Sequence, residues 1–435
     1  MKRVLDIEVW MLLMVAMLLT ACSDHSGEGS DEKGDCFLNI YVYAPEHPML
    51  TRADVGTIAS RTAKEHEVKT LQIWVFKHGD GSLVGYLETE PTFLNETPGQ
   101  EMFQMKVEKE FADHPVNVDV YVVANAYVLP DNYDKFINCN TNYDLTYIDD
   151  NHNEVTLTLG ESTTRTQLDA AKIGVSSFGV VEKEGETGYF IPGVSEVPAA
   201  GLPMSGVEKD QPIYGSYPTL RVGTQDAMTT VQLTRAVSKL RFVLCRKTED
   251  LTNAKKILVS VDNIQLDGNV IPTASYLMPK ETPSYTSYVL TPISYGSVSK
   301  ETLPEQANPM EFMYETQTAQ EYEDMINAEV AKNIADPTKG LKQLGLTYLR
   351  ESDKQLTGTI TYTYKDRESL TAGWVEHSGE TVTFSMADAG DFLRNHSWIV
   401  YVFYMDSKIY TLTVTNIGMK VWTSGGLDPH PVYNW

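Results

Sequence analysis

The stretch VNVDVYVVANA, residues 116–126, gives the clearest indication of the fold class. Valine recurs at every second position, as Val116, Val118, Val120 and Val122, with polar or larger side chains between. Successive side chains of a β-strand point to opposite faces, so this spacing predicts a strand with one buried and one wetted face. Strands of this kind build layered β-domains.

Further strands are predicted on both sides of this one. Apolar positions alternate, β-branched and aromatic residues are frequent, and Gly, Pro, Asn and Asp punctuate the runs. The sequence HGDG at 78–81 predicts a hairpin turn. Between residues 127 and 217 we expect long loops with short strands, including a turn at 202–206. The predicted strands cover residues 37–44, 71–76, 83–87, 103–107, 257–264, 311–314, 359–364, 381–386, 397–405 and 409–422.

A long strand is also predicted over residues 230–245, but its apolar positions change parity. They fall on odd numbers such as Val231 and Val237, and then on even numbers such as Leu240. A bulge or bend around residues 237–239 would reconcile the two halves, and a domain junction is expected near this segment.

One helix stands out, beginning at residues 318–321. The sequence TAQE fits a capping box, and Asp336 followed by Pro337 ends the helix. We expect its apolar stripe to pack on a core rather than to bind a ligand. The stripe comprises Tyr322, Met325, Ile326 and Val330.

The length of 435 residues exceeds what one hydrophobic core usually organises. We therefore expect a mainly β protein with minor α content and two β-sandwich domains, at residues 37–225 and 226–435. The single short helix is placed in the second domain.

The composition excludes several classes of function. A net charge of −24 and a pI near 4.7 make attraction to nucleic acid or anionic lipid unfavourable, and the acidic balance is interpreted as serving solubility. The four cysteines, at positions 22, 36, 139 and 245, show no zinc spacing and do not form a disulfide scaffold.

The sequence contains none of the common catalytic, phosphate-binding or dinucleotide-binding motifs, so we expect no enzyme, no cofactor and no metal site. Asp428 and His430 are interpreted as solvated tail residues. His396, at the head of a predicted strand, is interpreted as a turn residue rather than a general base.

The first 21 residues have the features of a secretory leader. Lys2 and Arg3 precede an apolar run at 9–19, which is short for a membrane span. The sequence LTAC, ending at Cys22, resembles the lipobox of bacterial lipoproteins, which implies cleavage before Cys22 and lipidation of its thiol. An ordinary signal peptide is the alternative.

Residues 22–36 form a polar, acidic, Gly- and Ser-rich tether. It resembles the surface-export tether of Bacteroidetes lipoproteins. That resemblance implies display on the outer face of the outer membrane.

Several segments lie in a common order along nearly the whole mature chain. They are LTRA at 50–53, residues 70–76 with the turn at 79–81, VYVVANA at 120–126, residues 202–206, VQLTRAVSKLRF at 231–242, FMYE at 312–315, RNH at 394–396, VW at 421–422 and VYNW at 432–435. Together they resemble the fimbrillin family, the subunits of Bacteroidales type V pili. This chain departs from that pattern at residues 312–316, which lack an expected Glu-Asn pair, and at 317–354, which have the character of an insertion.

The resemblance implies Greek-key, transthyretin-like sandwiches and proteolytic cutting between Arg52 and Ala53 by an arginine-specific protease. Arg61 is the competing site. The cut would free residues 37–52, whose strand fills a groove with either the Leu38 parity or the Phe37 parity inward. A strand of the next subunit, from residues 412–422 or the tail to 435, would replace it.

The predicted function is therefore a structural subunit of a surface fimbrium that polymerises by strand exchange and serves adhesion. Its expected partners are other fimbrial subunits, outer-membrane lipid through Cys22, and a surface ligand on a host or another bacterium, with no nucleic acid. The alternatives are a tip, cap or anchor protein of the same family, or a surface lipoprotein that binds glycans through a row of exposed aromatic side chains.

Overall fold

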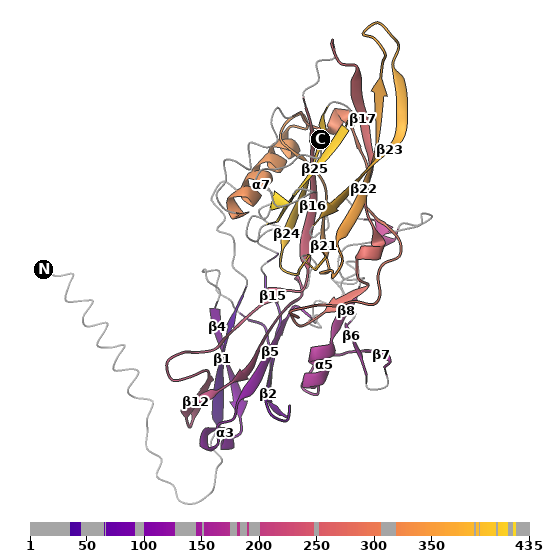
Figure 1. The fold of residues 1–435 in the computed structure, drawn as a ribbon. Helices are drawn as coiled ribbons and strands as arrows, with labels where there is room; N and C mark the ends of the chain where they lie inside the picture. Colours follow the sequence, from indigo (N-terminus) through magenta and orange to yellow (C-terminus); the bar gives the residue numbers. More distant parts are fainter. Residues whose placement is uncertain are drawn as a thin grey trace, which may run out of the picture. The chain divides into compact units, whose positions relative to one another are not determined.

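The computed structural model describes residues 35–44, 65, 67–91, 100–126, 145–149, 152–174, 181–182, 189–190, 201–247, 252–305, 319–386, 389–390, 392–405, 408–415 and 421–422 (Figure 1). Residues 36–435 belong to one compact unit. The fold is mainly β with minor α content, which confirms the predicted class. No helix among the described residues is long and apolar enough to cross a membrane.

Two sheets of the N-terminal half pack face to face and enclose a common core. The first has the order β12-β13-β1-β14, with β4 paired to the free side of β1. Its strands are β1 (Cys36–Tyr43), β4 (Gln100–Val107), β12 (Ile213–Ser216), β13 (Thr219–Val222) and β14 (Thr230–Gln232). The second, β15-β11-β5-β2-β3, is built from β2 (Leu71–Lys77), β3 (Leu83–Thr89), β5 (Val118–Ala124), β11 (Met204–Gln211) and β15 (Thr234–Arg235).

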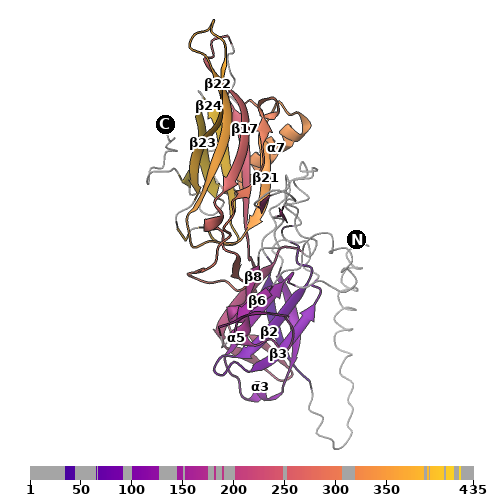
Figure 2. The ribbon, with the colours of Figure 1, turned by 90° about the vertical axis from the view of Figure 1, so that its right-hand side faces the viewer.

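A third layer covers the outer face of the second sheet (Figure 2). It combines helix α5 (Arg165–Ala170) with the small sheet β18-β8-β6-β7. The strands of this small sheet are β6 (Leu145–Ile148), β7 (Glu154–Thr156), β8 (Lys172–Gly174) and β18 (Ala274–Tyr276).

This layer overturns one prediction about residues 116–126. Every side chain of β5 is buried, because Val120 and Val122 face the sandwich core while Tyr121 and Val123 face the third layer. The alternation of valines indicated the strand correctly, but the second face is covered rather than wetted.

A second sandwich follows in the C-terminal half. One sheet has the order β23-β22-β17-β19-β10-β9 with β20 paired to β17, and the other has the order β21-β16-β24-β25-β26. The first comprises β9 (Val181–Glu182), β10 (Tyr189–Phe190), β17 (Lys256–Leu266), β19 (Ile293–Ser294), β20 (Val298–Ser299), β22 (Leu356–Asp366) and β23 (Val375–Met386). The second comprises β16 (Ser238–Arg246), β21 (Lys342–Leu349), β24 (Ser397–Met405), β25 (Lys408–Thr415) and β26 (Val421–Trp422).

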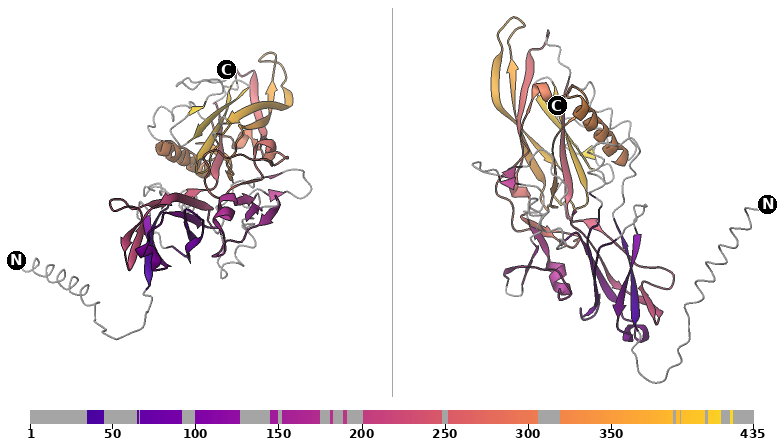
Figure 3. Two further views of the ribbon diagram at one scale, coloured as in Figure 1. Left: turned by 60° about the horizontal axis from the view of Figure 1, so that its bottom comes forward. Right: turned by 180° about the vertical axis from the view of Figure 1, so that it is seen from behind.

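Helix α7 (Ala319–Ala335) lies on the outer face of the β16–β24 sheet, opposite the β17–β22 layer (Figures 1 and 3). Of the predicted core-facing stripe, Ile326 and Val330 are buried and Met325 packs against the same cluster, while the side chain of Tyr322 lies outside the described part of the chain. Two shorter helices, α3 (Glu110–Asp113) and α5, were not predicted, because neither is long enough to show a periodic pattern.

Residues 230–246 pass from one half to the other. The predicted single strand is divided into β14, β15 and β16, which belong to three different sheets. The break falls at Leu233 and at Ala236 with Val237, which explains why the apolar parity changes there. The predicted turn at 202–206 is wrong in part, since β11 begins at Met204.

Candidate strand-binding site

β1 lies inside its sheet, with hydrogen-bonded neighbours on both edges. It runs antiparallel to β4 over its whole length, from Cys36 opposite Val107 to Tyr43 opposite Gln100. Its other edge pairs in parallel with β13 along the first part and with β14 along the last part. A segment from the very start of the described chain thus completes a sheet whose other strands come from residues 100–107 and 213–232.

Two further backbone hydrogen bonds extend these ladders. The N–H of Phe37 donates to the carbonyl of Pro218 at 2.9 Å, and the N–H of Leu233 donates to the carbonyl of Tyr43 at 2.9 Å. Since a buried peptide group without a partner is costly, removal of β1 would leave both flanks in need of a replacement strand.

The inward side chains of β1 are small or aliphatic. They are Cys36, Leu38, Ile40 and Val42, and each is at most 1% exposed. The structure therefore selects the Leu38 parity from the two left open by the sequence. Burying four such side chains contributes about 6–12 kcal/mol before the cost of ordering the strand.

The outward side chains differ in character. Phe37, Asn39, Tyr41 and Tyr43 are half-buried on the other face of the sheet. A strand that replaces β1 must consequently alternate apolar residues, which enter the core, with larger or polar residues, which remain at the surface.

Cys36 marks the beginning of β1 with a buried free thiol. Burial raises the pKa of this thiol, which keeps it in the unreactive protonated form. Cys245, in β16, is also free and buried, and burial raises its pKa to about 12. Cys36 can therefore report on the position of β1, with Cys245 as an internal reference.

The residues predicted to be modified or cut are Cys22, Arg52, Ala53 and Arg61. All four lie outside the described residues, as do Cys139, Asp428 and His430. The candidate donor segment is described only in part. Its β25 pairs with β24, and β26 pairs with β25 through Thr413 opposite Trp422.

β13 was not predicted as a neighbour of β1, and neither was β14, although β14 lies within the strand predicted over residues 230–245. β13 is only four residues long and lies between the predicted loop region, which ends at residue 217, and the strand predicted from residue 230. Its buried Leu220 and Val222 alternate with Thr219 and Arg221, and this short period of two was the available signal.

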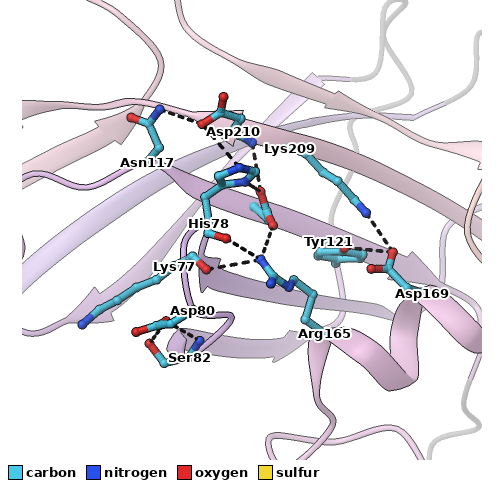
Figure 4. Close-up of polar contacts among 11 residues, drawn as sticks. Lys77, His78, Asp80, Ser82, Asn117, Tyr121, Arg165, Asp169, Lys209 and Asp210 are labelled. Carbon is cyan, nitrogen blue, oxygen red and sulfur yellow. Dashed lines mark hydrogen bonds and ion pairs between the residues drawn. The ribbon is translucent and has the colours of Figure 1, made fainter.

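A polar cluster holds the third layer on the β2–β5 sheet (Figure 4). The carboxylate of buried Asp119 accepts hydrogen bonds from Arg165 Nη1 at 2.8 Å and from the N–H of Asp210 at 2.9 Å. Its Oδ1 also lies 2.7 Å from Nδ1 of His78. Arg165 Nη1 donates in addition to the carbonyl of His78, which ties α5 to the β2–β3 turn.

This geometry indicates a structural role for the cluster. Burial opposes ionisation of Asp119, but the hydrogen bonds from Asp210, His78 and Arg165 outweigh it and lower the pKa of Asp119. Because the carboxylate accepts three donors, it serves to join the three segments that supply them. His396 lies between the turn at Arg394 and Asn395 and the start of β24, and its Nδ1 is 2.7 Å from the carbonyl oxygen of Arg394.

Exposed aromatic rings are the feature that glycan binding would need. Among the described residues, the exposed aromatic side chains are Tyr214, Tyr217 and Trp374. A cation already covers a face of each ring, with Arg221 over Tyr214, Lys109 over Tyr217, and Arg367 over Trp374 at 4.4 Å. Tyr214 and Tyr217 belong to the β12–β13 hairpin, whereas Trp374 precedes β23 in the C-terminal half.

No family model matches the sequence, and no curated protein matches it either. Solved structures similar to this chain do exist, and they include fimbrial proteins, as the sequence resemblance led us to expect. A tip fimbrial protein of Porphyromonas gingivalis, solved with a C-terminal truncation, is 13% identical, with 88% of this chain and 99% of that chain covered and a TM-score of 0.39.

Two further matches have similar values. A fimbrial assembly protein of Parabacteroides distasonis is 13% identical, with 89% of this chain and 98% of that chain covered and a TM-score of 0.43. A fimbrillin of Porphyromonas gingivalis is 10% identical, with 85% and 90% covered and a TM-score of 0.41.

Proposed function

We propose that this protein is a structural subunit of a surface fimbrium that serves adhesion and polymerises by exchange of β1. The observation that carries the proposal is the position of β1. An N-terminal segment with alternating apolar side chains fills an interior place in a sheet made of later strands. Its place can be taken by an equivalent strand from another copy.

The proposed sequence of events begins with lipidation of Cys22 and display at the outer membrane. An arginine-specific protease then cuts between Arg52 and Ala53. The peptide bond is hydrolysed, and β1 is then held only by its hydrogen bonds and buried side chains. A strand from a neighbouring subunit enters beside β4, β13 and β14 as β1 leaves.

The C-terminal segment offers a suitable donor. In residues 417–422, Ile417, Met419 and Val421 alternate with Gly418, Lys420 and Trp422. This arrangement repeats the pattern of β1, in which aliphatic residues alternate with polar or aromatic ones. We place the donor within residues 412–422, with the tail to 435 as the alternative.

The test follows the thiol of Cys36 in the full-length protein. Wild type and Arg52→Ala are treated with an arginine-specific protease, labelled with a maleimide, mapped by peptide mass spectrometry and imaged by electron microscopy. Wild-type filaments should lack residues 22–52, and Cys36 should become labelled on the released fragment while Cys245 stays unlabelled. Arg52→Ala should stay monomeric with both thiols protected.

Filaments whose subunits still begin at Cys22 would exclude strand exchange of this kind. A wild-type protein that is cut, keeps Cys36 protected and never assembles with other copies would instead point to a tip, cap or anchor position.

A further inference from the structure

Glu65 is a buried carboxylate close behind the two candidate processing bonds. It is 7% exposed, and its side chain enters a socket on the C-terminal half. Oε1 lies 3.0 Å from Nζ of Lys239, and the hydroxyl of Tyr348 donates to the same oxygen at 2.7 Å. Lys239 and Tyr348 face each other directly across the β16–β21 ladder, so their side chains leave the same face.

The backbone around Glu65 is held as well. Nε of Arg235 donates to the carbonyl of Glu65 at 2.9 Å. Buried Asn125 then fastens the following residues: its Nδ2 donates to the carbonyl of Glu67 at 2.8 Å, and its Oδ1 accepts from the N–H of Lys69 at 2.7 Å. Pulling Glu65 out of its socket therefore strains a series of contacts that leads into β2.

The covalent chain relates this anchor to the two arginines. Residues 62–64 alone separate Arg61 from Glu65, and a fully extended chain covers about 3.5 Å per residue, so Arg61 stays within about 14 Å of the anchor. Residues 53–64 separate Arg52 from Glu65, and a segment of this length lets Arg52 lie much farther from the anchor.

A protease cleft binds extended backbone on both sides of the bond that it cuts. Cutting after Arg61 would draw residues 62–64 into that cleft, and because these three residues are all that separates Arg61 from Glu65, Glu65 would be pulled away from Lys239 and Tyr348. Removing one partner of a buried ion pair is strongly unfavourable. Cutting after Arg52 makes no such demand.

We propose that burial of Glu65 selects Arg52 over Arg61 as the processing bond, an inference that rests on the proposed function only in requiring a cut. Glu65 is thus a specificity-determining residue of the substrate. The same anchor holds the chain behind the cut, so that maturation removes β1 and leaves β2 in place.

The experiment treats the full-length protein, purified in detergent, with a limiting amount of an arginine-specific endoprotease and identifies the new N-termini by sequencing. Wild type should begin at Ala53. Glu65→Ala should gain a product that begins at Thr62, with the rate of this cut at least tenfold above wild type. Glu67→Ala is the matched control, because the exposed carboxylate of Glu67 forms an ion pair with exposed Lys69 at 3.1 Å.

Global unfolding gives a different pattern, because Arg241 and Arg350 are buried and would then be cut too. If Glu65→Ala unfolds, Tyr348→Phe provides the test instead, since it keeps the aromatic ring and removes only the hydrogen bond to Glu65. It should raise the Arg61 cut without cuts at Arg241 or Arg350.

Equal cutting of Arg52 and Arg61 in wild type, or no change in a folded Glu65 or Tyr348 variant, overturns the inference. The products are read on monomers before assembly, so failure of strand exchange would leave this result unaffected.

Discussion

Neighbouring side chains of β1 differ in burial because they point to opposite faces of the sheet. Ile40 is 1% exposed in the sandwich core, whereas its neighbour Tyr41 is half-buried on the outer face, opposite Met102. A charge placed at position 40 would lose its hydration, whereas a charge at position 41 would keep much of it.

We therefore expect Ile40→Asp to lower the free energy of unfolding by at least about 3 kcal/mol and Tyr41→Asp by only about 1 kcal/mol. Urea unfolding of the uncut protein measures both. A larger loss for Tyr41→Asp would mean that β1 sits in the opposite register.

Asp119 gives a prediction that depends on pH. Its pKa is lowered in the folded protein, so its charge stabilises the fold above the unfolded value near 4, and this contribution is lost as the pH falls through the folded pKa. Asp119→Asn should cost about 1–3 kcal/mol at pH 7. The difference from wild type should shrink below about pH 4.

Thermal unfolding across a pH series compares the two proteins. A difference that stays constant down to pH 2 would show that the charge of Asp119 does not stabilise the fold.

At the scale of elements, helix α5 is held at its first residues. The Thr164 side chain accepts from the N–H of Gln167, whose side chain accepts in turn from the N–H of Thr164, and Arg165 reaches Asp119. Six residues would not keep a helix on their own, so α5 depends on these contacts and on buried Leu168.

A double-mutant cycle measures this dependence. Arg165→Met and Asp119→Asn should each destabilise the protein, and their effects should fall short of additive by about 1–3 kcal/mol, because each removes the same ion pair. Thr164→Ala, which leaves that pair intact, should cost about 1 kcal/mol and be additive with Asp119→Asn. Full additivity of Arg165→Met and Asp119→Asn would show that their ion pair does not hold α5 in place.

The sequence predicted where strands and helices lie better than it predicted which segments pack against them. Local alternation was enough to place β2, β4 and β5, β-rich composition placed β1, and a capping box placed α7. The burial of both faces of β5 could not be read from its own residues, because the covering layer comes from residues 145–174 and 274–278.

The β1 site shows the same limit. The inward parity of β1 was undecided because both parities carry large apolar or aromatic side chains, and only the core on one side distinguishes them. The Glu65 anchor gave no signal at all, since Lys239 and Tyr348 are distant in sequence and meet through β-sheet pairing.

At the scale of the whole molecule, the two sandwiches are joined by more than one segment. Residue 225, the proposed domain boundary, precedes β14, β15 and β18, which pair with strands of the first half. One buried cluster also combines Trp74 and Leu168 of the first half with Leu346 of the second.

A buried ion pair reinforces this connection. Arg394 Nη2 lies 2.6 Å from Oε1 of Glu351, and Arg394 Nη1 donates to the carbonyl of Leu277, next to the β18–β8 pairing. We expect calorimetry of wild type to give one unfolding transition. Arg394→Met should cost about 3–5 kcal/mol, because Glu351 would stay buried without its cation.

Two well-separated wild-type transitions would show that the halves unfold independently. Lys339→Met, at an exposed ion pair with Asp336, serves as the control and should change stability by less than about 1 kcal/mol.

The position of β1 has a last consequence, which concerns time rather than structure. If the chain is lipidated at Cys22 and cut after Arg52, as proposed above, the lipid-bearing fragment also carries β1, and the rest of the subunit is held at the membrane only by the hydrogen bonds on the two edges of β1 and by its buried side chains. Departure then follows the dissociation rate of β1, which should be slow because both ladders and the core contacts must open together. Under the proposed strand exchange, an incoming strand that displaces β1 step by step would shorten this residence time, so that joining a fibre and leaving the membrane would become a single event.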